Sequence, residues 1–381
     1  MSTLALRGRL VVDGEVWDGG TVLVEGGKIK AVERGAPATA ARETLDLPES
    51  LLVPGFVELQ INGAFGVDVA TEPERLRELS AKLPLTGTTS YLPTVVSLPL
   101  DEYPRVLPRL AREIAKKAPG AEPLGLHLEG PFLNPDKKGA HLPENIAPPD
   151  VRALAAMLED APVRMVTVAP ELPGASELVR LAAGRGVLVS LGHSAADHAA
   201  TLAALDAGAR GMTHLFNAMG PLHHREPGLP GVALSDGRVA CGIIADGRHI
   251  HPDVVRFALA AIGPDRLYLT TDAIAAAGMG SGEYALAGRR VGLEDGVPRL
   301  DDGTIAGSVL EMDEAVRNVV KFAGCTLPEA VKMASTTPAR LAGVGDFKGR
   351  MAPGYDADLV ALTADGLRVE AAWVGGESVA G

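Results

Sequence analysis

The chain has 381 residues, of which 46% are hydrophobic and 22% charged, so its composition indicates a folded globular protein rather than a disordered chain. A formal net charge of -12 argues against a general nucleic-acid or anionic-membrane surface, because both need an excess of Lys and Arg. One local anion pocket stays compatible with that charge. The two cysteines, Cys241 and Cys325, predict neither a disulfide framework nor a thiolate metal site.

The opening of the chain is rich in β-forming residues. Strands are expected at 4–12 and 21–32, the second of them broken by the turn pair Gly26-Gly27. Charged residues stand where a signal peptide would need its apolar run, and no later apolar run reaches the roughly 18 residues that a membrane span needs. We therefore expect a cytoplasmic protein.

From residue 51 onward, eight short apolar runs alternate with amphipathic or Ala/Leu-rich stretches. The runs are LLVPGFVELQ, TTSYLPTVV, LGLHLEG, VRMVTVAP, VLVSLGH, GMTHLF, VACGIIAD and LYLTTD. The stretches between them predict the crossover helices that parallel strands require, at 73–83, 101–117, 151–158, 175–183, 195–207 and 252–262. Eight βα repeats within roughly 250–300 residues predict an α/β protein built on a (β/α)8 barrel.

One stretch between two runs differs from the others. Residues 217–236 are too rich in Gly, Pro and His for a simple crossover helix, and long irregular loops of this kind are commonly functional. Residues 284–300, with Asp295-Gly296 as a turn, predict a hairpin in the last βα loop.

The end of the chain returns to β character. Apolar runs at 355–363 and 367–379 flank the polar stretch between them, and the second run contains another glycine pair, Gly375-Gly376. We expect both termini to form one small β-sandwich domain. The predicted domains are residues 1–51 with 346–381 for the sandwich, and residues 52–345 for the barrel.

Four polar residues stand at predicted carboxyl ends of barrel strands, where barrel enzymes build their sites: Glu129, His193, His214 and Asp272. Two imidazoles and a carboxylate are a typical ligand set for catalytic zinc or iron, which leaves Asp272 as a general base. Taken singly, such a histidine is commonly a hydrogen-bonded core residue, and Asp272 is compatible with N-capping a helix. The four together favour the metal site. For Ser194, with Asp197 three residues on, we expect an N-cap.

These residues occur in longer strings: HLEGPFLNPDKKGAH, GHSAADH, THLFNAMGPLHHREPG, GIIADGRH and TDAIAAAG. The strings resemble the N-acetylglucosamine-6-phosphate deacetylases of the amidohydrolase superfamily, densely from Pro54 to Gly307 and more weakly towards both ends. The resemblance implies hydrolysis of the acetamide of a phosphorylated N-acetyl amino sugar to acetate and glucosamine 6-phosphate. The expected setting is amino-sugar catabolism and cell-wall recycling.

Site roles follow from the resemblance position by position. It implies Glu129, His193 and His214 as metal ligands and Asp272 as the catalytic base. His141 lies against the acetamide carbonyl in the family, where a donor stabilises the developing oxyanion.

The resemblance also implies a set of substrate-binding residues. Those expected around the phosphate and the sugar are Ala140, His141, Asn217, Ala218, Arg225, His249, Ile305, Ala306 and Gly307. Arg225 would reach the site of the neighbouring subunit of a homodimer, although a solvated loop residue is the simpler interpretation of an isolated arginine.

A departure from the broader superfamily concerns the number of metals. Where many amidohydrolases have His-x-His after the first strand, this chain has Gln60 and Asn62, whose neutral amides are poor transition-metal ligands. We therefore expect one divalent metal per subunit, zinc or iron first, with manganese or cobalt compatible. None of the remaining histidines is expected to be a ligand. His127 is compatible with a core residue or a hydrogen-bond partner of the site, and His198 is expected on the surface. His223 and His224 precede Arg225 and are compatible with shaping the phosphate site or an interface, and His251 follows His249 at a strand-like spacing.

Two other functions stay open at this point. The nearer one is a deacetylase of another N-acetylhexosamine 6-phosphate, such as the galactosamine epimer, because the motifs define metal and phosphate better than hydroxyl stereochemistry. The more distant one is a catalytically silent amidohydrolase relative that serves as a binding or assembly protein.

Overall fold

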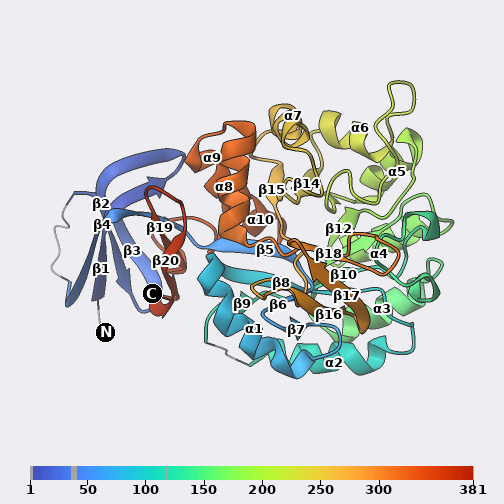
Figure 1. The fold of residues 1–381 in the computed structure, drawn as a ribbon, viewed down its shortest axis with the longest axis horizontal. Coiled ribbons are helices and arrows are strands. Elements are labelled where there is room, and N and C mark those ends of the chain that lie inside the picture. Colours follow the sequence, from blue (N-terminus) through green and yellow to red (C-terminus); the bar gives the residue numbers. More distant parts are fainter. Residues whose placement is uncertain (1–2, 36–40, 117–118, 381) are drawn as a thin grey trace.

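The computed structural model describes residues 3–35, 41–116 and 119–380, and they form a sheet domain and a barrel. Figure 1 shows the sheet domain on the left, where blue N-terminal and red C-terminal strands lie side by side, and the barrel on the right. The predicted α/β barrel with a terminal β domain is confirmed in this arrangement. The domain boundaries given above stay a prediction.

The sheet domain is one seven-stranded mixed sheet in the order β21-β20-β19-β4-β1-β2-β3. Its strands are β1 (Thr3–Val12), β2 (Glu15–Glu25), β3 (Lys28–Arg34), β4 (Glu43–Pro54), β19 (Leu359–Thr363), β20 (Val369–Val374) and β21 (Glu377–Ala380). β4 pairs in parallel with β1 and antiparallel with β19, so it joins the two termini into one sheet. Alternate side chains of both halves share one hydrophobic cluster, for example Leu6, Leu52 and Trp373.

The two predicted glycine turns are present in this sheet. Gly26 and Gly27 join β2 to β3 with φ of 60° and 81°, a backbone conformation that glycine adopts without steric cost. The pair Gly375-Gly376 joins β20 to β21 in the same way, with φ of 55° and 76°.

Eight parallel strands form the barrel, in the order of the chain. They are β5 (Phe56–Ile61), β8 (Thr88–Val96), β10 (Leu126–Glu129), β11 (Val163–Val168), β12 (Leu188–Leu191), β13 (Gly211–Met212), β14 (Ala240–Ile243) and β15 (Leu267–Leu269). The segment after β15 closes the ring onto β5, because Asp272 N–H donates to Gln60 O at 3.0 Å and Ile61 bridges Ala273 in parallel. All eight predicted runs therefore contribute a strand.

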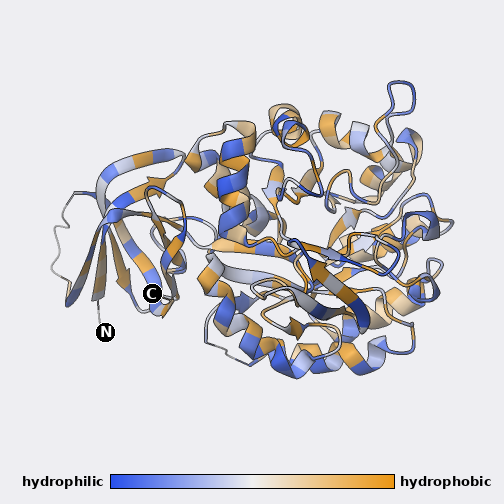
Figure 2. Cartoon of the chain, viewed as in Figure 1, coloured by the Kyte–Doolittle hydropathy of each residue, from blue (hydrophilic) through white to orange (hydrophobic). Residues whose placement is uncertain are grey.

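Helices cover the outside of the barrel. They are α1 (Leu76–Lys82), α2 (Tyr103–Ile114), α3 (Val151–Asp160), α4 (Ala175–Gly184), α5 (His198–Ala207), α6 (Gly228–Ser235), α7 (Pro252–Ile262), α8 (Met312–Ala323), α9 (Leu327–Ala334) and α10 (Thr336–Leu341). Figure 2 shows hydrophobic residues along the barrel strands, while the outer helices carry hydrophilic residues beside hydrophobic ones, as one-sided burial requires. No helix within the described ranges is long and apolar enough to cross a membrane.

The smaller elements lie in the connections. Short strands are β6 (Gly63–Ala64), β7 (Val67–Asp68) and β9 (Glu122–Pro123), and 3-10 turns are found at Pro73–Arg75, Leu83–Thr86, Pro135–Lys137 and Pro143–Asn145. The predicted hairpin after β15 is present as three antiparallel strands, β16 (Gly282–Leu286), β17 (Arg289–Glu294) and β18 (Val297–Arg299), with Asp295-Gly296 as one turn.

Two local expectations differ from the structure. The stretch 217–236 is irregular only in its first half, and α6 follows, because Pro230 lies in the first helical turn, where a missing N–H breaks no intrahelical bond. The cap of α5 is Asp197, whose carboxylate accepts from Ala200 N–H at 2.8 Å. The N-cap expected at Ser194 is wrong, since the Ser194 hydroxyl donates to Glu171 at 2.6 Å.

Candidate active site

A cavity of about 350 Å³ lies at the carboxyl ends of the barrel strands. Its walls bring together most of the residues singled out from the sequence, although they come from different βα units. Those that line it are Glu129, Ala140, His141, His193, His214, Asn217, Ala218, His249, Asp272, Ile305 and Gly307.

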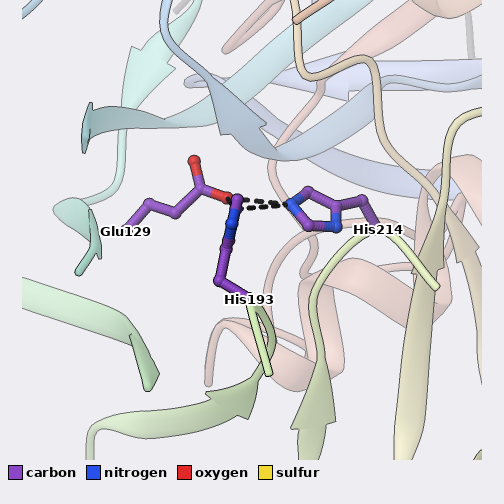
Figure 3. Close-up of side chains that lie close together, drawn as sticks. All are labelled: Glu129, His193 and His214. Atoms are coloured by element: carbon purple, nitrogen blue, oxygen red, sulfur yellow. Dashed lines mark hydrogen bonds and ion pairs between the residues drawn. The ribbon is translucent and has the colours of Figure 1, made fainter. Parts of the chain in front are cut away.

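Three side chains converge at the bottom of this cavity. Glu129 is the last residue of β10, while His193 and His214 follow β12 and β13. Figure 3 shows their tips pointing toward one another: Glu129 Oε1 lies 3.2 Å from His193 Nε2 and 3.0 Å from His214 Nε2. All three are buried, and they are the one group among the described residues with the spacing of metal ligands.

The hydrogen bonding of His193 prepares it to be a ligand. Its Nδ1 lies 2.8 Å from the carbonyl oxygen of Lys137, which can only accept, so Nδ1 carries the proton. This tautomer leaves Nε2 as the ligand atom, and Nε2 faces His214 Nε2 at 3.1 Å. Such a second interaction on the far nitrogen is typical of metal-binding histidines.

The same three residues are poorly satisfied by one another. Two imidazole nitrogens and a carboxylate oxygen meet out of water, and the two Nε2 atoms face each other at 3.1 Å, so at most one of them can donate to the other. A buried polar group of this kind is costly without a compensating ligand. A divalent cation bound by Glu129, His193 and His214 satisfies the three converging atoms, so the donor set fits a transition metal.

Asp272 lies beside this group and is not a helix cap. Its Oδ1 accepts hydrogen bonds from Asn62 Nδ2 at 2.7 Å and Gln60 Nε2 at 3.1 Å. Burial, together with the neighbouring Glu129 carboxylate, raises the pKa of Asp272 to about 6. A carboxylate with a pKa near neutrality can both accept and return a proton, which is the property of a general base.

Gln60 and Asn62 stand at the place where many amidohydrolases have His-x-His, and here they form hydrogen bonds with two carboxylates. Gln60 Nε2 also donates to Glu129 Oε1 at 2.9 Å, so one amide bridges the carboxylates of Glu129 and Asp272. Both side chains act as hydrogen-bond donors toward carboxylates. The single metal expected from these two amides stays a prediction.

His141 reaches the cavity from the loop after β10. The backbone N–H of Ser97 lies 3.2 Å from His141 Nδ1 and can only donate, so Nδ1 is an acceptor. Burial, with the neighbouring His193 ring, lowers the pKa of His141 to about 3, so the ring is neutral. Its single proton is then on Nε2, which lies 3.9 Å from Glu129 Oε2 and donates into the site.

Several site residues have an uncommon backbone conformation. His193, His214 and Asp272 have φ of 47°, 32° and 50°, in the left-handed region that non-glycine residues rarely adopt. Each costs on the order of 1–3 kcal/mol and persists only where the surroundings impose it. Such strain at three strand ends that converge is typical of a functional site.

One wall of the cavity carries groups that suit an anion. His249 Nδ1 lies 2.6 Å from Asp246 Oδ2, which leaves Nε2 for a ligand. Ala218 has φ of 49°, and its N–H has no acceptor among the residues that the structure describes. The side chain of Asn217 donates to the His214 carbonyl at 3.3 Å, so this loop is attached to the backbone of one of the three converging residues.

Two predicted substrate residues lie outside the cavity lining. Arg225 is exposed on the irregular loop, where its Nη1 lies 2.7 Å from His224 Nε2. Ala306 is fully buried in a hydrophobic cluster beside the cavity, between Ile305 and Gly307, which do line it.

The other histidines are not part of the group that converges in the cavity. His127 is fully buried, with Nε2 2.8 Å from Thr167 Oγ1, and burial lowers its pKa to about 4. The remaining four are exposed: His198, His223, His224 and His251.

Sequence reasoning missed the groups that orient the predicted side chains. The Ser97 N–H orients the ring of His141, and the Lys137 carbonyl orients the ring of His193. Arg289 from β17 lines the cavity. Backbone donors and acceptors carry no sequence signal. Ser97 directly follows the run TTSYLPTVV and was the one position with a signal, since it is a polar residue at a strand end.

A buried Glu-His-His group with an adjacent carboxylate, at the carboxyl ends of eight parallel strands, is typical of barrel hydrolases of the metal-dependent class. The profile of the amidohydrolase family matches residues 51–379. The chain belongs to the amidohydrolase family.

Within this family, the chain is similar to deacetylases of phosphorylated N-acetyl amino sugars. The chain is 39% identical to an N-acetylgalactosamine-6-phosphate deacetylase of Escherichia coli O157:H7, over 98% of this chain and 99% of that protein. It is also 39% identical to the human N-acetylglucosamine-6-phosphate deacetylase, over 98% of this chain and 93% of that protein. A mutant of the Mycobacterium smegmatis N-acetyl-D-glucosamine-6-phosphate deacetylase, in complex with N-acetyl-D-glucosamine-6-phosphate, shares the fold with a TM-score of 0.93 and 35% identity, over 100% of both chains.

Proposed function

We propose that this protein is a metal-dependent deacetylase that hydrolyses N-acetyl-D-glucosamine 6-phosphate to D-glucosamine 6-phosphate and acetate. The observation that carries the proposal is the convergence of Glu129, His193 and His214 next to Asp272 and His141 in one cavity. The relatives described above support the choice of substrate.

The metal site proposed here holds one divalent transition ion, zinc or iron first, with manganese or cobalt compatible, bound by Glu129, His193 and His214. When bound, such an ion acts as a Lewis acid and activates water near neutral pH. Gln60 and Asn62 hold the neighbouring carboxylates by donating to them, which supports one ion per subunit.

The chain's own groups perform the proton transfers in this proposal. Asp272 accepts a proton from the attacking water as its oxygen bonds to the acetyl carbon. His141 Nε2–H donates to the carbonyl oxygen, where negative charge develops. Asp272 then returns the proton to the amine nitrogen as the C–N bond breaks, and acetate and the free amino sugar leave.

The phosphate is held away from the metal group. We assign it to the Asn217–Ala218 backbone and to His249, which all line the cavity. Arg225 is exposed in its own protomer, which supports its use by the neighbouring subunit of a homodimer. Ala140, Ile305, Ala306 and Gly307 form the walls around the sugar.

The galactosamine epimer is the second candidate substrate. It is favoured by the similarity to the Escherichia coli O157:H7 protein, which matches this chain as well as the human one does. A silent binding protein is disfavoured, because each ligand and the base are present and oriented.

Acetate release by metal-analysed protein tests the proposal. The substrates are the 6-phosphates of N-acetylglucosamine and N-acetylgalactosamine, and N-acetylglucosamine without phosphate as the control. We expect the highest kcat/KM with N-acetylglucosamine 6-phosphate and a value at least about a hundredfold lower without the phosphate, since charged hydrogen bonds are lost. Preference for the galactosamine epimer would change the assigned substrate, and no release from any of them would refute a deacetylase.

A further inference from the structure

The hairpin after β15 forms part of the catalytic cavity, and we call residues 282–300 the roof hairpin. Its Leu286, Ala287 and Arg289 line the cavity. Figure 1 shows its strands β16 and β17 in the barrel half of the molecule. Its hydrophobic side packs in one cluster with Val96 and Ala306, and Ala140 packs against that cluster. The roof hairpin therefore touches both the strand ends and the loop that carries His141.

Two hydrogen bonds attach the turn of this hairpin to two different segments, one at Asp68 and one at Ala140. Ala287 N–H donates to Asp68 Oδ2 at 2.7 Å, and Asp68 is itself buried. Arg289 Nη1 donates to the carbonyl oxygen of Ala140 at 2.9 Å. Within the described residues, Ala140 is the hydrogen-bond partner of this guanidinium, and Arg289 has no ion pair there.

Arg289 and its neighbour Arg290 have different surroundings although they are the same residue type. Successive side chains of a strand point to opposite faces, so one of the two faces the cavity and the other the solvent. Arg289 is partly buried, whereas Arg290 is exposed and pairs with Glu283. Arg290 is therefore a matched control on the same strand.

The contact of Arg289 acts on the peptide that carries His141. The Ala140 carbonyl and the His141 N–H belong to one planar peptide unit. Arg289 binds its oxygen, and the His141 N–H donates to Lys138 O at 2.9 Å. The Ser97 N–H then fixes the ring through Nδ1. The backbone and the ring of the oxyanion donor are thus held from three sides, one of which is Arg289.

We propose that Arg289 is a positioning residue for the deacetylation, which ties the roof hairpin to the Ala140 carbonyl and so places His141 Nε2 over the acetamide. The proposal rests on the function proposed above. A positioning residue that acts in the transition state changes kcat, whereas a residue that only binds the sugar phosphate changes KM.

The test compares the Arg289→Ala, Arg289→Lys and Arg290→Ala variants with the unchanged protein, each analysed for bound metal and thermal unfolding. We expect kcat to fall at least about tenfold in Arg289→Ala, the scale of one lost charge-assisted hydrogen bond, with KM within about threefold. Arg289→Lys keeps one charged donor and should have an intermediate kcat. Arg290→Ala should match the unchanged protein.

Hydrogen exchange gives a readout that is independent of turnover. In Arg289→Ala, amides of the roof hairpin and of residues 137–141 should exchange faster together, while Arg290→Ala leaves both unchanged. A kcat of Arg289→Ala within twofold of Arg290→Ala would overturn the proposal, and so would a rise in KM alone. Absence of acetate release from the unchanged protein would instead refute the proposed function. Hydrogen exchange of the roof hairpin and of residues 137–141 would then still test whether Arg289 attaches the hairpin to Ala140.

Discussion

At the scale of single residues, the site is organised by hydrogen bonds whose direction can be assigned. A backbone carbonyl fixes the proton of His193 on Nδ1, and a backbone N–H fixes that of His141 on Nε2. The two imidazoles in the same cavity thus have opposite uses in the proposed reaction, His193 as a metal ligand through Nε2 and His141 as a hydrogen-bond donor to substrate.

Replacing Asp272 by Asn tests the general base. The Asn62 and Gln60 donors to Oδ1 can be kept by an amide oxygen, so the variant should fold and hold its metal. We expect kcat to fall at least about a hundredfold, the scale of a lost general base. The measurement is acetate release by protein of known metal content, and near-normal turnover would rule out this role.

Replacing His141 by Ala tests the oxyanion donor. Loss of one preorganised donor lowers kcat by about 10²–10³, because the charge develops in a site shielded from water. The matched control is His198→Ala, an exposed histidine at the start of α5. An equal kcat in the two variants would show that His141 plays no part in the chemical step.

The residues that converge in the candidate site were predictable from the sequence, and those that orient them were not. Glu129, His193, His214 and Asp272 stand where polar residues interrupt apolar runs, a signal that needs no contact information. Gln60 was noticed only as a missing histidine. Its bridge between two carboxylates depends on β5 lying beside the segment after β15, which only the closed barrel establishes.

At the scale of elements, strands were predicted better than loops. Continuous apolar runs mark strands buried on both faces, and this pattern located all eight barrel strands. The short helix α6 was not predicted, because Gly228, Pro230 and Gly231 are typical of loops. Leu229 and Val232 are nevertheless buried and pack this helix against the barrel. Tertiary burial overrode local propensity there.

Glu58 on β5 stabilises the closure of the barrel between β5 and the segment after β15. Its carboxylate accepts from Thr270 Oγ1 at 2.5 Å, Gln60 N–H at 2.9 Å and Thr271 N–H at 2.8 Å, so it joins β5 to the segment that leads to Asp272. Burial raises the pKa of Glu58 to about 7 despite these bonds. A folded-state pKa above the unfolded one stabilises the fold at low pH, and this stabilisation is lost as pH rises toward 7.

The Glu58→Gln variant removes this titration. As the pH rises from 5 to 8, the unchanged protein should lose on the order of 2 kcal/mol of unfolding free energy relative to the variant. The reason is that only the unchanged protein must ionise a buried carboxyl. Urea unfolding of both proteins at the two pH values measures the shift. A difference that is constant with pH would show that Glu58 does not titrate in this range.

At the scale of the whole molecule, one of the contacts between the barrel and the sheet domain is made by a buried lysine. Lys348 Nζ lies 2.8 Å from Glu122 on β9 and 2.8 Å from Asp358, next to β19. Asp356 lies 3.0 Å away. Burial alone would lower the pKa of Lys348, but the carboxylates of Asp358 and Glu122 outweigh burial and raise it. The charge of Lys348 is therefore kept in the folded protein.

Replacing Lys348 by Met leaves Asp358 buried without its partner. We expect the free energy of unfolding to fall by about 3–5 kcal/mol, the cost of breaking a buried ion pair from one side. Lys321→Met on the exposed side of α8 is the control and should change it by less than about 0.5 kcal/mol. Equal stability of the two variants in urea would contradict a structural role for Lys348.

The central claim is that Glu129, His193 and His214 hold a single metal at which Asp272 assists the hydrolysis of a phosphorylated N-acetyl amino sugar. The most direct measurement is acetate release from N-acetylglucosamine 6-phosphate as zinc or ferrous iron is titrated into protein stripped of metal by a chelator. We predict that activity rises linearly and stops at one equivalent per chain. Full activity without metal, or a rise that continues to two equivalents, would contradict the claim.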